Sequence, residues 1–261
     1  MINQKDSQKK LQKILALLIL GVLAVLVTGC GSKEVTIDAY VGDGMIEPMN
    51  AIKEAYEAEN PRVTINYHFA GSATLEEAMR SLERGDVYMP GAASFIDSLN
   101  ADGLIVASYP VAYHIPAIIV RAGNTIVTSW DDLAKEGVRL AVSNPGLSSG
   151  GKAADAIISK SPLNEKIRAN ITVLGSDVRS VIQLLVDNEV DAVISWSPDV
   201  KLAPGLVTIE IPEEINVRKE IWIAVTGYTT AENEALKFAQ FVAGEVGRKY
   251  FEEKGFLFIE K

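Results

Sequence analysis

Three short, glycine-rich loops in this sequence could bind a small anion through main-chain N–H groups. Each precedes an expected helix: Gly42-Asp43-Gly44-Met45, Gly71-Ser72-Ala73-Thr74 and Gly146-Leu147-Ser148-Ser149-Gly150-Gly151. The first N–H groups of a helix have no partner within the helix, and this end carries partial positive charge. Such groups, together with hydroxyls, bind anions without any charged side chain. The loops could also be ordinary turns and helix caps.

Asp43 does not suit an anion site. A carboxylate about 4 Å from one negative charge costs roughly 4 kcal/mol at an effective dielectric near 20. Two other roles remain open for this residue. It could cap its own helix, as Asp often does before a helix, or it could contact a cationic or hydroxyl-bearing ligand.

Other chemistries find less support in the sequence. The run from Gly146 to Ala153 nearly spells a nucleotide-binding P-loop, but Ala153 replaces the Ser or Thr that would hold Mg²⁺. His68 and His114 are far apart, and one Cys cannot complete a convincing zinc site with them. No G-x-S-x-G elbow accompanies Ser148 or Ser149. We therefore expect no enzyme, no cofactor and no metal.

The elements that would hold these loops alternate between strand and helix. Short apolar runs predict strands over 35–41, 63–69, from 87, 117–120, 139–143, 171–174 and 192–196. Helical spacing predicts helices over 45–59, about 75–82, 130–133, about 152–159, 178–187 and 231–254. Alternation of this kind predicts mostly parallel, covered sheets. The pattern restarts near residue 117, which indicates two α/β lobes.

The first 29 residues are interpreted as a lipoprotein signal peptide. Lysines precede an apolar run, from Ile14 to Val27, that is short for a membrane span. The run ends just before Cys30, the only Cys of the chain. This ending resembles the lipobox of exported lipoproteins, in which the Cys becomes the lipidated first residue. An uncleaved N-terminal helix is the alternative, and both place the remaining chain outside the cytoplasm.

Charge and cysteine content narrow the choice of partners. The chain has a formal net charge of −9, and without the leader 21 basic residues stand against 33 acidic ones, which gives −12. Nucleic-acid binding is disfavoured, because it needs a basic face. A single Cys excludes an intrachain disulfide. Stability must therefore come from a hydrophobic core.

The order of segments resembles the type II periplasmic binding proteins, most closely their molybdate- and tungstate-binding branch. The local matches are Phe69 to Leu75, Gly85 to Tyr88, Ser129 to Leu133, Asn144-Pro145, Ile211 to Glu214 and Lys254 to Phe256. The resemblance implies an α/β fold with two Rossmann-like lobes joined by a two-crossing hinge. It implies lobe I from residues 30–113 plus 218–261 and lobe II from 114–217.

The resemblance and the glycine-rich loops together give the candidate ligand-binding residues. These are Asp43, Gly44, Met45, Gly71, Ser72, Ala73, Met89, Pro90, Ser149, Gly150, Val178 and Trp196. Two positions depart from the family pattern. Gly44 stands where the family has a Ser whose hydroxyl holds the oxyanion, and Trp196 stands where a Tyr is common. Trp can donate a hydrogen bond but cannot accept one.

The resemblance implies a monomeric solute-binding protein of an ABC importer. It would be anchored by lipid on Cys30 at the extracytoplasmic face of the membrane and would bind a molybdate- or tungstate-like oxyanion in the interlobe cleft. Other readings stay open: a different ligand, such as a carboxylate, another anion or a metal chelate, an extracytoplasmic enzyme on the same fold, or a sensor.

Overall fold

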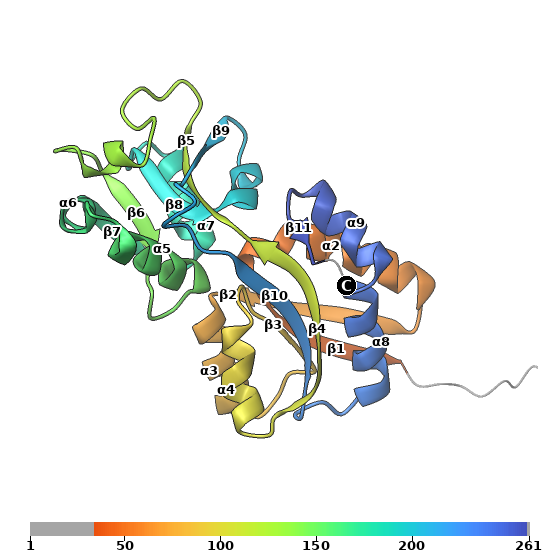
Figure 1. Cartoon of the computed structure of the whole chain (residues 1–261). Helices are drawn as coiled ribbons and strands as arrows, with labels where there is room; N and C mark the ends of the chain where they lie inside the picture. Colours follow the sequence, from red (N-terminus) through yellow and green to blue (C-terminus); the bar gives the residue numbers. More distant parts are fainter. Residues whose placement is uncertain (1–33, 260–261) are drawn as a thin grey trace, which may run out of the picture. The chain divides into compact units, whose positions relative to one another are not determined.

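The computed structural model describes residues 34–259, and its first sheet has the strand order β11-β4-β10-β3-β1-β2 (Figure 1). The strands are β1 (Val35–Gly42), β2 (Val63–Ala70), β3 (Val87–Met89), β4 (Ile105–His114), β10 (Lys219–Thr226) and β11 (Leu257–Phe258). The helices around it are η1 (Asp43–Met45), α2 (Ile46–Glu59), α3 (Ser72–Leu82), α4 (Ser94–Ala101), α8 (Glu232–Val242) and α9 (Glu245–Glu253).

The second sheet has the strand order β7-β6-β8-β5-β9. Its strands are β5 (Pro116–Arg121), β6 (Leu140–Ser143), β7 (Ile171–Gly175), β8 (Ala192–Trp196) and β9 (Leu206–Glu210). Its helices are η2 (Asp131–Ala134), α5 (Ser149–Lys160), α6 (Asn164–Ala169), α7 (Val178–Val186) and η3 (Ser197–Leu202).

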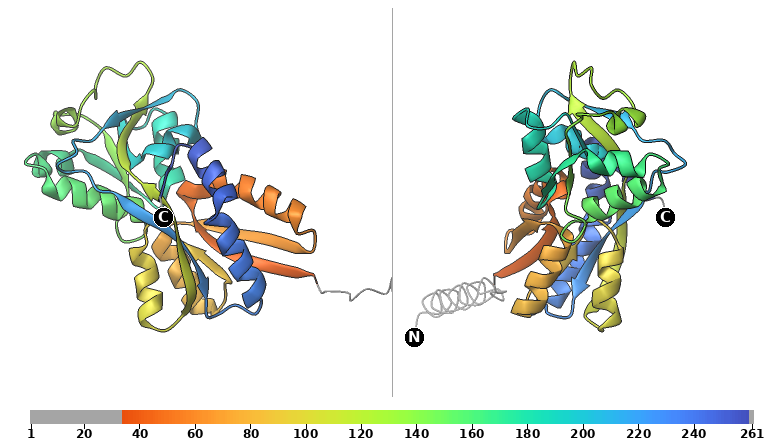
Figure 2. Two further views of the ribbon diagram at one scale, coloured as in Figure 1. Left: turned by 45° about the vertical axis from the view of Figure 1, so that its right-hand side comes forward. Right: turned by 90° about the vertical axis from the view of Figure 1, so that its left-hand side faces the viewer.

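The central strands of each sheet carry apolar side chains on both faces, and helices pack against both faces. In β1, Ile37, Ala39 and Val41 belong to the core that includes apolar residues of α2, α8 and α9. Tyr40 points the other way and packs with residues of α3 and α4. Figure 2 shows these two helical layers on either side of the first sheet. Successive side chains of a strand face opposite ways, so one strand serves two cores.

The second sheet follows the same rule. Ile118 of β5 packs in the core that includes residues of α5 and α6, and Ile119 packs in the core that includes residues of α7. The two sheets thus form two lobes, each with cores of its own. Burial of these apolar side chains is the main stabilising contribution to folding.

The predicted mostly parallel sheets are in fact mixed. Among the described strands, β1 pairs in parallel with β2 and β3, and β6 pairs in parallel with β7 and β8. The remaining pairs, which include β4 with β10 and β5 with β9, are antiparallel. The strands β4, β9, β10 and β11 were not predicted, and the first three of them flank the two connections between the lobes.

The chain crosses between the sheets twice, and the two crossings lie side by side. Ile115 alone separates β4 from β5, and residues 211–218 separate β9 from β10. His114 at the end of β4 is paired with Lys219 at the start of β10. The pairing brings both connections to one place, where a small change in backbone dihedrals can turn one lobe against the other.

The single long helix predicted over residues 231–254 is two helices. The break falls at Ala243–Gly244, and Gly244 has the extended backbone of an N-cap, with φ −91° and ψ −172°. A side chain on Gly247 would collide with the carbonyl of Val242, so the two helices meet closely. The apolar spacing continues across this break, and spacing alone therefore could not reveal it.

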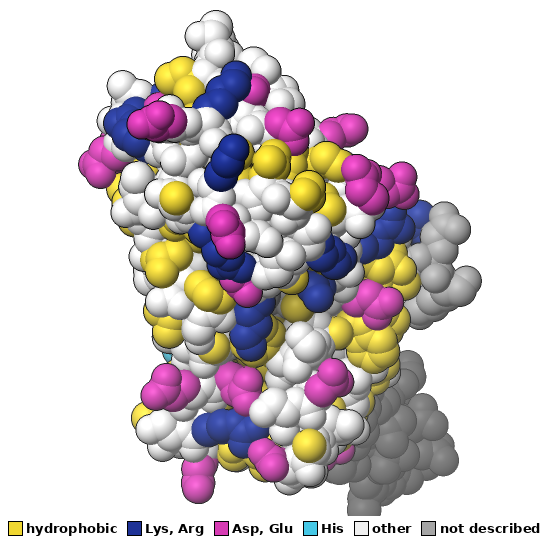
Figure 3. All heavy atoms as spheres, turned by 60° about the vertical axis from the view of Figure 1, so that its left-hand side comes forward, with side chains coloured by type: hydrophobic (Ala, Val, Ile, Leu, Met, Phe, Trp, Pro, Cys, Tyr) yellow, Lys and Arg dark blue, Asp and Glu magenta, His cyan; other side chains and the backbone are white. Residues whose placement is uncertain are grey.

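Over the described residues, no helix combines the length and the hydropathy that a membrane span requires. The predicted signal peptide and Cys30 lie outside the described residues. On the face drawn in Figure 3, acidic and basic side chains are interspersed with scattered hydrophobic ones.

Candidate functional site

The two lobes meet where loops after β1, β2 and β3 face the starts of α5 and α7. Asp43 follows β1, and its Oδ2 accepts hydrogen bonds from the main-chain N–H groups of Val178 at 2.8 Å and Arg179 at 3.3 Å. Ala73, in the first turn of α3, donates its N–H to the carbonyl of Leu147 at 3.1 Å. Each lobe therefore supplies a hydrogen-bond acceptor to N–H groups at the start of a helix in the other lobe.

The N-terminus of α7 holds two carboxylates. Asp177 is its N-cap and accepts from the N–H of Ser180 at 2.8 Å, while Asp43 takes the N–H groups of Val178 and Arg179. Together the two carboxylates take the first three N–H groups of the helix. Asp43 therefore caps a helix of the opposite lobe, and α2, which follows it, has no side-chain cap.

Asp43 is held in an environment that disfavours its charge. It is only 7% exposed, and burial raises its pKa to about 6, with a further contribution from the negative charge of Asp177. The N–H groups of Val178 and Arg179 oppose this shift. Desolvation therefore outweighs the favourable end of the helix, so this carboxylate gains a proton more readily than an ordinary Asp.

The second loop lies at the start of α3. Ser72 is buried, and its hydroxyl oxygen accepts a hydrogen bond from the N–H of Gly91 at 3.1 Å. Gly71, the N-cap, lies so close to Leu147 that an added Cβ would lie 2.6 Å from the Leu147 carbonyl oxygen. The glycine here allows the two main chains to approach across the lobe boundary.

The third loop leads into α5. Ser148 is the N-cap, and its hydroxyl accepts from the N–H of Gly150 at 3.2 Å. A side chain on Gly91 would collide with the hydroxyl of Ser149, so these two residues touch across the lobe boundary. Gly151 has no room for a side chain beside the main chain of Ser143 and Asn144. Close packing thus explains the glycine run that resembles a P-loop.

Trp196 and His114 form an aromatic stack at the centre of this contact. Their ring centroids are 4.3 Å apart and the rings are inclined by 7°. Gly44 lies against the pair, and a Cβ built on it would be 3.4 Å from Cδ1 of Trp196. A Cβ on Gly150 would be 3.4 Å from the indole nitrogen, so that N–H lies beside the α5 N-terminus.

Other predicted site residues have side chains in the core. Met45 and Met89 are fully buried among the apolar residues of the first lobe, and Pro90 is also buried. These three residues can serve the site only through their main chains. The structure therefore brings together Asp43, Gly44, Gly71, Ser72, Ala73, Ser149, Gly150, Val178 and Trp196 at the lobe boundary.

Two residues at this boundary were not among the predicted site residues. His114, considered from the sequence only as a zinc ligand and set aside, lies at the end of β4, and Asp199 lies in η3, directly after β8. Each is 1% exposed. Asp199 could have been found from the sequence. It lies in the segment that follows the carboxyl end of a predicted strand, which is where α/β proteins bind ligands. His114 required knowledge of β4, which the pattern did not reveal.

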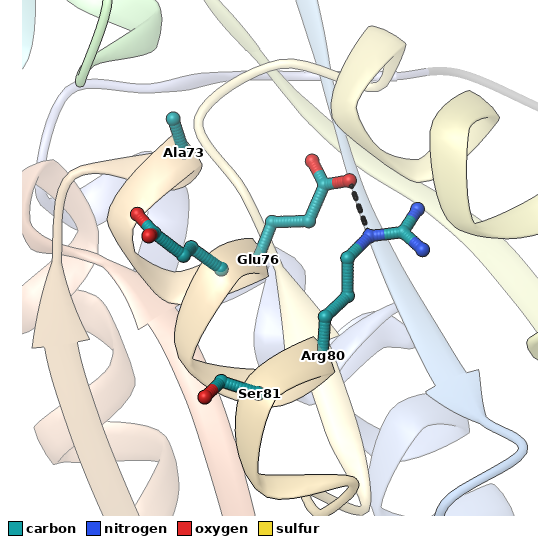
Figure 4. Close-up of a pocket in the computed structure, with 5 residues that line it drawn as sticks. Ala73, Glu76, Arg80 and Ser81 are labelled. Atoms are coloured by element: carbon teal, nitrogen blue, oxygen red, sulfur yellow. Dashed lines mark hydrogen bonds and ion pairs between the residues drawn. The ribbon is translucent and has the colours of Figure 1, made fainter.

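Several hollows lie elsewhere on the described part of the chain. The first, on the exposed side of α3, is lined by Ala73, Glu76, Glu77, Arg80 and Ser81 (Figure 4). Its one cation, Arg80, is already paired with Glu76 at 3.0 Å and Asp102 at 2.7 Å, so it offers little to an anion. The second, of about 780 Å³, lies beside the hinge and includes Tyr113, Glu213 and Arg218. No group of three metal-ligating side chains occurs among residues 34–259.

Comparison with known proteins identifies the family. The model of the bacterial extracellular solute-binding proteins matches residues 37–257. The chain belongs to this family. The resemblance to type II solute-binding proteins that was drawn from the sequence is therefore confirmed.

Individual relatives agree with this assignment. The molybdate-binding protein ModA of Mycobacterium bovis is 27% identical over 213 residues, which cover 78% of each chain. The putative ABC transporter substrate-binding lipoprotein YvgL of Bacillus subtilis is 23% identical over 244 residues, 89% of this chain and 93% of that one. The sulfate-binding protein SubI of Mycobacterium tuberculosis superposes with a TM-score of 0.76 at 18% identity, over 85% of this chain and 86% of that one. The predicted two-lobed α/β fold is confirmed.

Proposed function

We propose that this solute-binding protein captures a small tetrahedral oxyanion, the class to which molybdate and tungstate belong, between its two lobes. One observation carries the proposal: the N-terminus of α7 already holds an anionic group from the other lobe, the carboxylate of Asp43, through two main-chain N–H groups. A surface that binds one small anionic group with good geometry can bind another. The molybdate- and sulfate-binding relatives support the same class.

Binding in this proposal is an exchange of anions. The oxyanion takes the N–H groups of Val178 and Arg179, and Asp43 turns away or takes up a proton. Both cannot remain charged there, since two charges about 4 Å apart repel by roughly 4 kcal/mol at an effective dielectric near 20. The raised pKa of Asp43, about 6, reduces the cost of this exchange.

The ligand would also link the lobes. Gly44 and Ser72 belong to the first lobe, whereas Gly150 and Val178 belong to the second. A ligand that contacts both sides favours the arrangement in which the lobes touch. We take residues 30–113 with 218–261 as one moving body and 114–217 as the other, hinged at the two adjacent crossings.

Isothermal titration calorimetry with molybdate, tungstate, sulfate and phosphate tests the proposal. We expect at least one of these anions to bind at a single site with a Kd in the micromolar range or below. Ser72→Ala should weaken that binding about ten- to a hundredfold, because a charge-assisted hydrogen bond is worth roughly 1.5–3 kcal/mol. If none of the four anions binds, the oxyanion proposal is wrong.

We further propose that Cys30 carries a lipid that holds the protein at the outer face of the membrane, where it delivers its ligand to an ABC-type importer. The relative YvgL supports both parts of the proposal, since it is described as a substrate-binding lipoprotein of an ABC transporter. Cys30→Ser should release the protein from the membrane fraction, and mass spectrometry of the wild type should show an N-terminus at residue 30 with added lipid mass. An intact Met1 on the mature protein would contradict the anchor. Normal uptake of the bound anion after deletion would contradict the import role.

A further inference from the structure

Two buried polar atoms at the lobe boundary have no hydrogen-bond partner within the described part of the chain. They are Nε2 of His114 and Oδ1 of Asp199. Buried polar groups in proteins are almost always hydrogen-bonded, because an unpaired one costs the free energy of its lost hydration. Two such atoms at one place therefore point to a group that the protein itself does not supply.

Nε2 of His114 is a hydrogen-bond acceptor. The other ring nitrogen, Nδ1, lies 2.9 Å from the carbonyl oxygen of Gly91 and must carry the proton to donate to it. A neutral imidazole has one donor and one acceptor nitrogen. Burial lowers the pKa of His114 to about 4, so at neutral pH the ring is uncharged and Nε2 offers only a lone pair.

Asp199 contributes the second atom. Its Oδ2 accepts from the hydroxyl of Ser195 at 2.6 Å and from the main-chain N–H of Trp196 at 2.9 Å. Those two donors fix the carboxyl group and leave Oδ1 to face the site. Burial and the nearby charge of Asp43 raise the pKa of Asp199 to about 8, against the hydrogen bond from Ser195.

Both atoms face the main chain of Gly44. A Cβ built on this residue would lie 3.4 Å from Oδ1 of Asp199 and 3.8 Å from Nε2 of His114. The absent side chain therefore leaves space at the point to which the two atoms are directed. Gly44 adjoins Asp43, so the same point lies next to the anion-binding end of α7.

We propose that this site selects an oxyanion that carries a hydroxyl of its own, such as hydrogen phosphate or hydrogen arsenate, and that this hydroxyl donates to Nε2 of His114. The inference rests on the proposed function, because it assumes that the oxyanion binds at the N-terminus of α7. The anion's oxygens accept hydrogen bonds from the main-chain N–H groups. Its O–H donates to Nε2 of His114 and lies against Oδ1 of Asp199.

The chemistry of the alternatives explains the selection. Sulfate, molybdate and tungstate carry no proton near neutral pH, so every atom that they present is an acceptor. Placed here, they would leave Nε2 of His114 unpaired and would set negative oxygens against its lone pair. Sites built to hydrogen-bond a hydroxyl reject analogues without one strongly, by roughly 10⁴-fold in favourable cases.

Calorimetry at pH 9 with the mature chain tests this selection, because Asp199 is then ionised and its Oδ1 is an acceptor. We expect phosphate to bind at least about a hundredfold more tightly than sulfate or molybdate. Asp199→Asn changes the hydrogen-bonding character of this side chain and keeps its shape. The amide oxygen of Asn can keep the bonds from Ser195 and Trp196, and the NH₂ group then replaces Oδ1 with a donor. This variant should shift the phosphate-to-sulfate ratio by at least about tenfold toward sulfate.

Asp155→Asn is the control. Asp155 lies on α5, is half-exposed and pairs with Arg168, so this substitution removes the same charge at a place away from the site. It should leave the ratio unchanged. Sulfate or molybdate binding as tightly as phosphate would overturn the selection while leaving the oxyanion proposal in place. Binding of an amine or a neutral solute, with no tetrahedral anion bound, would overturn both. If Asp199→Asn does not fold, the anion panel on the wild type decides alone.

Discussion

The carboxylate of Asp43, in the loop after β1, accepts a hydrogen bond of 2.8 Å from the main-chain N–H of Val178, the first residue of α7 in the other lobe. The sequence separation of 135 residues makes this the kind of contact that only the folded chain creates. An acidic side chain thus occupies the helix end at which the ligand is proposed to bind.

Asp43→Asn should raise the affinity for the preferred oxyanion, by up to about tenfold, because a neutral amide competes less well for the end of α7 and repels the ligand less. Calorimetry measures the change, with Asp155→Asn as the control for charge removed at a distance. Loss of binding in Asp43→Asn would show instead that the carboxylate pairs with a cationic ligand.

Gly44→Ala should abolish or strongly weaken oxyanion binding without unfolding the protein. The added methyl group would stand 3.4–3.8 Å from Asp199, Trp196 and His114, which is ordinary contact, and would fill the space proposed for the ligand. We expect affinity to fall at least about tenfold while thermal stability changes by no more than about 0.5 kcal/mol.

The matched control for that change is Gly227→Ala. A methyl group there would also make only ordinary contacts, at 3.6–3.7 Å from Leu104, and lies outside the site. It should alter neither affinity nor stability. Undiminished binding in Gly44→Ala would place the ligand somewhere else.

Gly91→Ala should keep the lobes apart, because its methyl group would collide with the hydroxyl of Ser149 across the boundary. We expect weaker ligand binding and, by small-angle scattering at saturating ligand, a larger radius of gyration than that of the wild type. Adding Ser149→Ala removes the colliding oxygen and leaves Cβ at 3.4 Å, so the double variant should regain compaction. A compact Gly91→Ala single variant would argue that the lobes do not close on the ligand in this arrangement.

Stability should fall as the pH rises from 6.5 to 8. The pKa of Asp199 is raised from an ordinary 3.8 to about 8, so the folded protein keeps a proton that the unfolded chain has already released. The stabilisation that protonated Asp199 contributes is fully present below pH 3.8. It is lost as the pH rises to about 8, at up to about 1.4 kcal/mol per pH unit. Asp43 also lowers the stability as the pH rises, but only between its ordinary pKa of 3.8 and its raised pKa of about 6.

His114 acts in the opposite direction and at lower pH. Its pKa is lowered from 6.5 to about 4, so its contribution is present above pH 6.5 and is lost as the pH falls toward 4. The interval between pH 6.5 and 8 therefore isolates Asp199 from both neighbours. Thermal melts across this interval should show the decline in the wild type and a flatter profile in Asp199→Asn. Equal slopes in the two proteins would contradict the assignment.

The sequence predicted the parallel part of each sheet and the helices beside it, because strands such as β1 and β8 are short, mainly apolar segments between clear turns. It did not reveal β4 or β10. In β4, Ser108 and Pro110 interrupt the apolar residues and hide the strand. β10 does carry a continuous apolar run, Ile221 to Val225, but that run alone does not show that it pairs with β4. The antiparallel pairing at the hinge depends on tertiary contacts rather than on local signals.

The candidate site was only partly predictable for the same reason. The glycine-rich loops at Gly44, Gly71 and Gly150 have local signatures and were found. The role of Asp43 depends on α7, and the roles of His114 and Asp199 depend on how the lobes meet. The unpaired state of these two buried atoms can be seen only in three dimensions.

Crystallographic location of a heavy oxyanion is the decisive test of anion binding at the N-terminus of α7. Crystals grown with arsenate, and in parallel with tungstate, would show the anion by its anomalous scattering. We expect an arsenate peak within hydrogen-bond distance of the N–H of Val178 and beside Gly44, with the Asp43 carboxylate withdrawn or protonated. A bound anion in the hinge hollow around Arg218, with the contact between Asp43 and Val178 intact, would contradict it.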